Sequence, residues 1–539
     1  MKYIVVSGGV VSGIGKGIVS SSVGTILKSK GYKVVHIKID PYLNFSAGMM
    51  APSEHGEVYV LNDGTETDLD LGNYERFLGI ELRNENAITS GKVMYELIKK
   101  EKNGAFEGKT LQVNPHCVDN IIDRIKKVSE SEVFDEYLNT KFKPEFVIIE
   151  LGGTVGDAES VMYLDALYKF ASTLPKEDFC LISVDFLVEL HGFEHKTRPL
   201  QVSARNLRSF GLKSDIIVCR GQCSLNDDII KKISDKCFVD SDSIILLPNL
   251  NCVYKVPSYM NKKGLFKCLQ KKMNIVEKSS SDDLFNKFEI LSKRFEKVVK
   301  IGIVAKYAGQ EDTYSSLIHA ILFSSFEVGV NAEIEWINAE SLEENIQTEI
   351  EKMKKCDSIL IPGGFGYRGI EGKMIAINYC RENNVPLLGI CLGLQLSVIE
   401  FARNVLNLKN ATSEEFEPKA ETHVITFLDF NGVQTKALRL GANNIVLAEN
   451  SKALSIYKNS MISERHRHRY GINKDYIGIF NEQGFICSGR SECDNVAEIF
   501  ELKEHPFFVG VQYHPEFNAK PLKPSPLFTA FIRAGSNSN

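Results

Sequence analysis

The chain has 539 residues, several times the length that one hydrophobic core usually serves, so we expect two or three domains. Hydrophobic residues make up 43% and charged residues 25%, a composition that excludes a mostly disordered, collagen-like or coiled-coil chain. The formal charge of −5 provides no global positive field, so we expect no nucleic-acid partner and expect local groups to hold any anionic ligand.

The sequence shows no run of about 18 apolar residues and no signal-peptide pattern at its start. We therefore expect a cytoplasmic protein with no membrane partner. The 12 cysteines are scattered, with no CxxC pair and one close spacing, Cys219 and Cys223 in CRGQC. This usage favours reduced thiols over a zinc site or a disulfide framework.

Short apolar runs that end in glycine-rich turns predict the strands, in chain order, at residues 3–9, 146–153, 214–221, 300–307, 358–364 and 386–393. Helical periodicity fills the intervals between them. Strands that alternate with helices predict an α/β fold with parallel sheets covered on both faces, and ligands bind such sheets at the carboxyl ends of the strands. We expect two doubly wound domains.

A polar, Ser/Asp-rich stretch at 274–289 interrupts this pattern, and a new strand begins at about residue 299. The predicted organisation is an N-terminal domain at 1–273, a linker at 274–298 and a C-terminal domain at 299–539.

A glycine-rich segment from Ser7 to Gly17 follows the first strand, and a helical pattern continues from Ile18. Glycines let backbone N–H groups converge on phosphate oxygens, and Lys16 adds a positive charge. The segment is not a strict Walker A motif, because the stretch from Gly9 to Gly15 is one residue too long and Gly17 replaces the metal-binding Ser/Thr. A plain glycine turn is the alternative interpretation.

Charged residues recur at comparable strand ends: Lys38, Asp40, Asp68, Asp70, Glu150 and Asp157. A Mg²⁺ ion shared with nucleotide phosphates needs one or two carboxylates, and we select Asp70 and Glu150 as its ligands. Each acid taken alone is more often a surface charge or a helix cap.

The segments GGVVSGIGKG, IKIDPYLN, EHGEVYVLNDG, TDLDLGNYERF and ELGGTVGDAES resemble the amidoligase domain of the CTP synthase family over about the first 270 residues. The resemblance implies a P-loop-like, dethiobiotin-synthetase-like fold in which Lys16 and Lys38 contact ATP phosphates and Asp70 and Glu150 hold Mg²⁺. The ATP-binding residues it implies are Gly13, Ile14, Gly15, Lys16, Gly17, Ile18, Lys38, Asp70, Asn249 and Leu250. Asn249 and Leu250 stand where the family often has Asp-Val.

The same resemblance implies a site for UTP and CTP at Ser12, Asp157, Ala158, Glu159, Lys196, Thr197, Arg198, Pro199, Leu200, Gln201 and Lys232. The family has Lys-Thr-Lys-Pro-Thr-Gln where this chain has residues 196–201. Arg198 presents a planar fork in place of a point charge, and Leu200 lacks a hydroxyl.

In the C-terminal half, Gly389 to Gly393 lie between a strand and a helix, the setting of a nucleophile elbow with Cys391 as nucleophile. The helix N-terminus stabilises the thiolate. A buried inert cysteine is the commoner fate of this residue type, and the flanking glycines weigh against it. Downstream, His514 and Glu516 fall on one side of a predicted extended segment, where they can serve as base and orienting carboxylate.

This constellation resembles the Cys-His-Glu triad of class I glutamine amidotransferases. The resemblance implies an oxyanion hole from the N–H groups of Gly364 and Leu392, and a glutamine site at Gly364, Leu392, Gly393, Leu394, Gln395, Glu415 and Arg469. Arg469 would clamp the substrate carboxylate. ERHRHRY, which contains Arg469, could also be a generic basic patch, and Gly471 replaces the acid usual in the family.

Taken over nearly the whole chain, the resemblance implies amination of UTP to CTP with ATP and L-glutamine through a 4-phosphorylated intermediate. It implies an ammonia passage along His55 and Val58, GTP as allosteric activator, CTP as feedback inhibitor, and a homotetramer that can form filaments. One alternative is another ATP-dependent amidoligase, of the cobyrinate-synthesis type; KTRPLQ and EHGEVYV weigh against it. The other is a filament-forming scaffold without catalysis, which the intact candidate catalytic residues disfavour.

Overall fold

The computed structural model describes residues 1–9, 13–190, 194–222, 226–279, 283–430, 433–434 and 437–537. Two residues singled out from the sequence, Ser12 and Cys223, lie outside the described residues. Contacts divide the chain into two compact units, one of residues 1–49 and 70–292 and one of residues 50–69 and 293–539. Within the described ranges, no helix combines the length and the apolar character that crossing a membrane requires.

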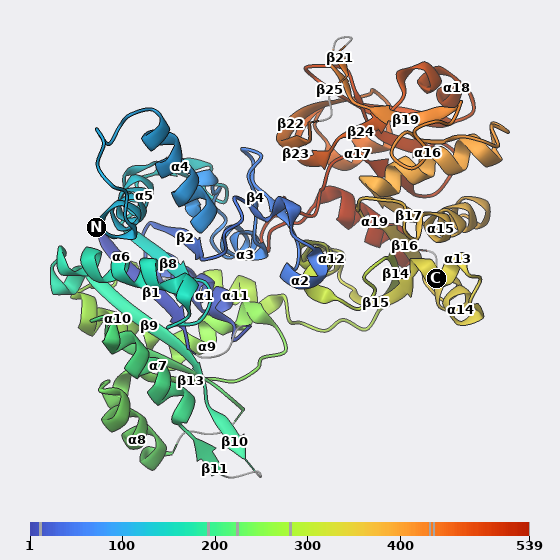
Figure 1. The fold of residues 1–539 in the computed structure, drawn as a ribbon. Helices are drawn as coiled ribbons and strands as arrows, with labels where there is room; N and C mark the ends of the chain where they lie inside the picture. Colours follow the sequence, from blue (N-terminus) through green and yellow to red (C-terminus); the bar gives the residue numbers. More distant parts are fainter. Residues whose placement is uncertain are drawn as a thin grey trace. The chain divides into compact units, whose positions relative to one another are not determined.

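The first unit is built on a parallel sheet with strands β1 (Lys2–Gly8), β2 (Val34–Asp40), β5 (Ala87–Thr89), β8 (Phe146–Leu151), β9 (Phe179–Phe186), β12 (Ile216–Arg220) and β13 (Ile244–Leu247). Their order across the sheet is β13-β12-β9-β1-β8-β2-β5, and Figure 1 labels β13, β9, β1, β8 and β2 of this sheet. The central strands are buried along almost their whole length, as expected of parallel strands covered on both faces.

Helices and two short hairpins complete this unit. The helices are α1 (Lys16–Ser29), α3 (Leu69–Leu78), α4 (Ser90–Lys102), α5 (Val118–Glu130), α6 (Val161–Ser172), α7 (Arg198–Ser209), α8 (Asp227–Cys237), α9 (Val256–Lys262), α10 (Leu265–Met273) and α11 (Asp283–Ile290). The hairpins are β6 (Val133–Asp135) with β7 (Thr140–Phe142), and β10 (Val188–Leu190) with β11 (Glu194–Lys196). Helix α1 packs on β1, β2 and β8, α5 packs on β2 and β8, and α7 packs on β9.

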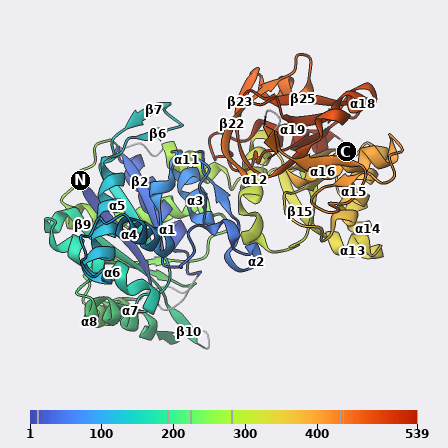
Figure 2. The same ribbon diagram turned by 45° about the horizontal axis from the view of Figure 1, so that its top comes forward.

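The second unit has a mixed sheet of β14 (Val298–Ala305), β15 (Asn331–Asn338), β16 (Ser358–Ile361), β17 (Leu387–Ile390), β22 (Arg439–Leu447), β23 (Met461–His468), β25 (Phe485–Ser491), β26 (Ala497–Leu502) and β27 (Phe508–Val511). The order is β15-β14-β16-β17-β27-β26-β25-β22-β23, parallel up to β27 and antiparallel beyond it. Figure 2 shows the antiparallel end, where β22 lies beside β23 and β25.

The other elements of this unit are helices α2 (Pro52–His55), α12 (Ser315–Val328), α13 (Ala339–Glu343), α14 (Gln347–Lys354), α15 (Ile370–Asn383), α16 (Leu392–Asn404), α17 (Lys452–Tyr457), α18 (Ile477–Glu482) and α19 (Pro526–Asn537), and strands β3 (Tyr59–Val60), β4 (Glu66–Thr67), β18 (Thr412–Ser413), β19 (His423–Phe427), β20 (Asp429–Phe430), β21 (Val433–Gln434) and β24 (Tyr470–Ile472). A hydrophobic core under α16 includes Leu394, Leu396 and Phe401.

All of the strands predicted from apolar runs are present, and the predicted α/β class is confirmed. The compact units differ from the predicted domain boundaries at two points. The predicted linker contains α11, which belongs to the first unit, and residues 50–69 group with the second unit. The reason for the second difference is that buried side chains of β23 hold residues 59–66, as described below.

Candidate active sites

In the first unit, the buried Lys38 of β2 lies between Glu150, near the carboxyl end of the neighbouring strand β8, and Asp70, which is in the first turn of α3 and not at the predicted strand end. Lys38 Nζ contacts the carboxylate of Asp70 and lies 2.8 Å from Glu150 Oε1. The Tyr74 hydroxyl donates to the other Glu150 oxygen. Burial lowers the pKa of Lys38, but the surrounding carboxylates outweigh burial and hold that pKa well above its usual value. The carboxylate oxygens of Asp70 and Glu150, which are the type of ligand that a hard cation prefers, therefore surround a position occupied by a positive charge.

The described end of the glycine-rich segment has two glycines in the left-handed region, Gly13 at φ 68° and Gly15 at φ 92°. Gly15, at φ 92°, caps the start of α1 and gives way directly to Lys16, whose Nζ donates to the Gly153 carbonyl at 3.0 Å. A Cβ on Gly17 would lie 2.0 Å from Asp70 Oδ1. The carboxylate of Asp70 thus occupies the place where a Walker A motif has its Ser/Thr side chain, which explains the glycine.

Arg220, at the end of β12, was not selected from the sequence. Its Nε donates to the Ile14 carbonyl at 3.2 Å, and its other nitrogens donate to the carbonyls of Leu247 and Pro248 and to Asn249 Oδ1 at 2.7 Å. It joins the glycine-rich segment to the predicted adenine-side residue Asn249. Its position at the end of a predicted strand, in IIVCRG, was the signal that could have identified it.

The predicted pyrimidine-site residues lie on loops and helix starts of the first unit. Asp157 accepts a hydrogen bond from the Thr154 hydroxyl, and Asp157, Ala158 and Glu159 are exposed. Thr197 is buried ahead of α7 and accepts from Gln201 at 2.9 Å. Arg198 and Lys232 are exposed, while Lys196, Pro199 and Leu250 are partly buried.

Leu200 requires a correction. Its side chain is fully buried in a hydrophobic cluster with Leu187, Ile217 and Ile233, so the side chain is not available to a nucleotide and only the backbone of Leu200, in the first turn of α7, could contact one. An apolar side chain in the first turn of α7 faces the core, where a threonine hydroxyl would need a partner. We therefore leave the Leu200 side chain out of the nucleotide site.

In the second unit, Cys391 lies on a strained turn between β17 and α16. Its φ of 53° and ψ of −100° are unusual for a residue with a side chain, and such strain is typical of nucleophiles raised above a sheet. His514 Nδ1 lies 2.8 Å from Glu516 Oε1, so the other edge of the ring is free to face the cysteine. The segment that carries them is a turn after β27, which corrects the predicted extended conformation.

The electrostatics of His514 favour an imidazolium. Burial lowers its pKa, but the Glu516 carboxylate and a hydrogen bond to Cys391 outweigh burial and raise it to about 10. A proton taken from the thiol is therefore held well on His514, as a general base requires.

A cavity of about 210 Å³ opens at this triad. Five residues selected from the sequence line it: Val58, Gly364, Cys391, His514 and Glu516. The other predicted residues of this unit are not among its described lining residues: His55, Leu392, Gly393, Leu394, Gln395, Glu415 and Arg469. His55 is exposed at the end of α2, and Leu394 is buried in the core.

Two of the predicted glutamine-binding residues, Glu415 and Gln395, bond to residues near the cavity. A third, Arg469, has a side-chain nitrogen without a hydrogen-bond partner among the described residues. Glu415 Oε1 accepts from Gly366 N at 2.8 Å, which ties it to the PGGFG loop. Gln395 Nε2 donates to the Tyr470 carbonyl at 3.0 Å and to Gln512 Oε1 at 3.3 Å. Arg469 Nε is buried and, among the described residues, has no hydrogen-bond partner, so it could receive a carboxylate.

The ERHRHRY segment is β23 and the start of β24, and it is not a generic surface patch. Arg465 is fully buried and donates to the Tyr59 hydroxyl at 2.8 Å and to the Val60 carbonyl at 3.0 Å. Arg467 Nε lies 2.7 Å from Glu66 Oε1. These arginines hold residues 59–66 in the second unit.

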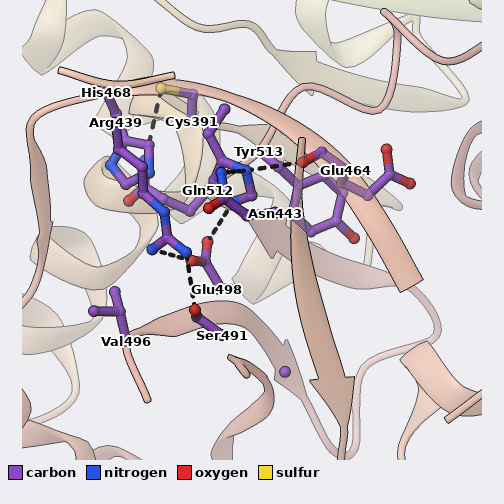
Figure 3. Close-up of polar contacts among 12 residues, drawn as sticks. Cys391, Arg439, Asn443, Glu464, His468, Ser491, Val496, Glu498, Gln512 and Tyr513 are labelled. Carbon is purple, nitrogen blue, oxygen red and sulfur yellow. Dashed lines mark hydrogen bonds and ion pairs between the residues drawn. The ribbon is translucent and has the colours of Figure 1, made fainter. Parts of the chain in front are cut away.

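Behind Cys391 lies a buried cluster on β22, β23 and β26 (Figure 3). In the part of the chain that the structure describes, His466, His468 and Glu498 have ligand-type atoms within 4.8 Å of one another. Arg439 pairs with Glu498 Oε1 at 2.7 Å, and His466 Nε2 lies 3.0 Å from Glu498 Oε2. Burial lowers the pKa of His468 to about 3. Because Arg439 already supplies the positive charge beside Glu498, we assign this cluster a structural role.

Lys373 on α15 is a second group that sequence patterns did not reveal. Only 1% of its surface is exposed, and Nζ donates to the Pro362 carbonyl at 3.1 Å, one residue before the Gly363–Gly364 turn. Burial, reinforced by Lys306, lowers its pKa to about 7. A lysine in a helix gives no signal in the sequence that it will be buried.

Comparison with known proteins matches each half of the chain to a family. Residues 2–275 match the family described as CTP synthase N-terminus, and residues 311–534 match glutamine amidotransferase class-I. The chain is 46% identical to the CTP synthase of Encephalitozoon cuniculi, covering 99% of each chain, and 43% identical to that of Methanosarcina acetivorans, covering 99% and 98%. The glutaminase domain of Trypanosoma brucei CTPS with bound acivicin is 32% identical, with TM-score 0.42, covering 45% of this chain and 95% of that one.

Together the two matches define a glutamine-hydrolysing ligase with a class I amidotransferase domain. More specifically, the chain belongs to the CTP synthase family.

Proposed function

We propose that this chain aminates UTP to CTP, using ATP to activate the uracil 4-oxygen and ammonia released from L-glutamine as the nitrogen source. The observation that carries the proposal is the Cys391–His514–Glu516 arrangement in a chain whose other unit holds Lys38 between Asp70 and Glu150. Phosphorylation of the 4-oxygen makes it a leaving group, and ammonia then displaces phosphate at the ring carbon. These are the substrates that membership of the family implies.

In the amidoligase half, we assign Lys16 and Lys38 to the ATP phosphates and to the phosphoryl group in transfer. Asp70 and Glu150 fit Mg²⁺ because their oxygens converge on a cation, here the Lys38 ammonium. When bound, Mg²⁺ would neutralise phosphate charge. Tyr74 orients Glu150, and Gly17 leaves room for Asp70. Arg220 holds the glycine-rich segment near Asn249.

In the glutaminase half, the Cys391 thiol gives its proton to His514, and the thiolate attacks the amide carbon of glutamine. The backbone N–H groups of Gly364 and Leu392 stabilise the oxyanion. His514 returns the proton to the departing nitrogen, which leaves as ammonia, and water hydrolyses the thioester to glutamate. Arg469 and Glu415 bind the substrate's charged groups. Gln395 donates to Gln512, which in turn contacts Cys391.

The remaining assignments follow from family resemblance. We propose GTP as an activator, CTP as a feedback inhibitor, a homotetramer that can form filaments, and a cytoplasmic location. Asp157, Ala158, Glu159, Lys196, Thr197, Arg198, Pro199, Gln201 and Lys232 are the residues we propose for UTP and CTP. The position of Val58 in the wall of the catalytic cavity supports an ammonia passage that begins there, with His55 nearby in sequence.

Direct chromatography of nucleotides and amino acids tests the function. With UTP, ATP and glutamine present, we expect equal amounts of CTP, ADP and glutamate. Omission of UTP should abolish ADP release beyond background. ADP release that depends on another acceptor would favour a different amidoligase, and absence of any turnover would favour a scaffold.

A further inference from the structure

We propose that Gln512 is a further catalytic residue of the glutaminase site, with its side-chain N–H donating to the sulfur of Cys391. Gln512 is fully buried and lies two residues before His514. Its Nε2 is 3.6 Å from Cys391 Sγ, within the range of hydrogen bonds to sulfur (Figure 3). The inference rests on the proposed role of Cys391 as the nucleophile.

The orientation of the Gln512 amide follows from its neighbours. The Tyr470 backbone carbonyl can only accept, so the end of Gln395 that lies 3.0 Å from it is the NH₂ group. That same NH₂ group lies 3.3 Å from Gln512, so the Gln512 atom facing it is the carbonyl oxygen. The remaining end of Gln512, its NH₂ group, therefore points at the sulfur.

The hydrogen bonds that the other groups can make to the Cys391 sulfur depend on whether the sulfur is a thiol or a thiolate. The Arg467 carbonyl, 3.9 Å from Sγ, can accept from a thiol S–H but offers nothing to a thiolate. His514 hydrogen-bonds the thiol and takes its proton. Once the sulfur is anionic, Gln512 and the His514 imidazolium are the donors that face it among the described residues. A hydrogen bond to a charged acceptor is stronger than one to a neutral group.

The backbone holds both partners in place. Cys391 N donates to the Val511 carbonyl at 2.7 Å, and Gln512 N donates to the Glu498 carbonyl at 2.8 Å. The Glu498 carboxylate is fixed in turn by Arg439 and His466. The buried cluster behind Cys391 therefore sets the position of the strand end that carries Gln512.

The reaction uses this donor twice. In the first half, the sulfur loses its proton to His514, the C–S bond forms and the C–N bond breaks as His514 protonates the leaving nitrogen. In the second half, His514 takes a proton from water as the water oxygen adds to the thioester carbon, the C–S bond breaks to release glutamate, and the sulfur leaves as a thiolate. Negative charge is on the sulfur at the start of one half and at the end of the other, and the Gln512 N–H stabilises it both times.

The first test is Gln512→Met, which keeps the length and removes the donor. We expect glutamine hydrolysis to fall roughly 10- to 100-fold. The midpoint of Cys391 alkylation by iodoacetamide against pH, followed on the Cys391 peptide by mass spectrometry, should rise by about one pH unit. CTP synthesis from ammonium chloride should remain. The matched control Asn331→Leu removes a side-chain amide at the opposite end of the sheet, bonded to Phe295, and should shift neither readout.

Gln512→Glu gives a second measurement if the methionine variant fails to fold. A protonated carboxyl can donate and an ionised one cannot, so its glutaminase activity should fall with rising pH relative to the wild-type profile. Alkylation profiles of both variants that superimpose on wild type would overturn the proposal. If the wild-type chain hydrolyses no glutamine, the proposed function fails, while the alkylation profile still decides whether Gln512 contacts the sulfur.

Discussion

Replacement of Lys373 by methionine should stabilise the protein at neutral pH and destabilise it at alkaline pH. Lys373 is 1% exposed and, among the described residues, its hydrogen-bond partner is the Pro362 carbonyl, with no carboxylate paired to it. Several acids on α15 and its neighbours have other partners: Glu371 pairs with Arg403, Glu400 with Arg381 and Glu340 with Arg368. The charged or ionisable groups that influence Lys373 are Lys306 and Cys391.

The magnitude follows from the pKa of Lys373, which burial and Lys306 lower from 10.5 to about 7. At about 1.4 kcal/mol per pKa unit, carrying the ammonium costs on the order of 4 kcal/mol at pH 7. Because the folded-state pKa is the lower one, the unfolded chain binds more protons between pH 7 and 10.5, and wild-type stability rises through that window. Methionine removes this dependence but leaves the Pro362 carbonyl unpaired, a loss of about 1–3 kcal/mol at every pH.

The assay is urea unfolding followed by the fluorescence of Trp336, the single tryptophan of the chain, which lies on β15 in the same unit as Lys373. We expect Lys373→Met to be about 2 kcal/mol more stable than wild type at pH 7 and less stable at pH 10. The exposed Lys355→Met is the control, and its difference from wild type should stay near zero at both pH values. An unfolding free-energy difference for Lys373→Met that is the same at pH 7 and pH 10 would refute the reasoning.

Three substitutions separate the two half-reactions. Cys391→Ala should abolish glutamine-dependent CTP formation and leave synthesis from ammonium salt, measured by nucleotide chromatography; equal loss with both nitrogen sources would contradict the division of labour. Lys16→Ala should remove synthesis with either source while basal glutaminase activity persists, and normal ammonia-dependent synthesis would show that the glycine-rich segment is structural. Val58→Phe, in the cavity wall, should raise the ratio of glutamate to CTP by uncoupling hydrolysis from amination, and an unchanged ratio would mean that ammonia does not pass there.

The sequence was sufficient for the features that depend on local pattern. Apolar runs that end in glycine located β1, β8, β12, β14, β16 and β17, because a strand buried on both faces must be apolar along its length, but they did not locate other strands such as β2, β9, β13 and β15. Cys391 was predicted as a nucleophile because its flanking glycines mark a tight turn, and the structure places it on one. The acids Asp70 and Glu150 were selected from their positions at strand ends, and Lys38 brings them together.

Features that depend on contacts distant in sequence were missed. Gln512 and Lys373 matter because of what surrounds them in the fold, and neither glutamine before a histidine nor lysine in a helix has a distinctive pattern. Residues 59–66 were assigned to the first domain because they follow its strands in sequence, whereas the buried Arg465 holds them in the second unit. Leu200 was assigned to the nucleotide site because it stands at a position of the family's motif, but its apolar side chain faces the core.

Transfer of the glutamine amide nitrogen to the pyrimidine ring is the central claim, and isotope labelling tests it most directly. The protein is incubated with UTP, ATP, Mg²⁺ and glutamine labelled with ¹⁵N at the amide, in the presence of unlabelled ammonium at low concentration, and the mass of the CTP is measured. We predict CTP one mass unit heavier, formed in equal amount to ADP and glutamate. CTP that carries only unlabelled nitrogen, or glutamate formed without any CTP, would contradict the account.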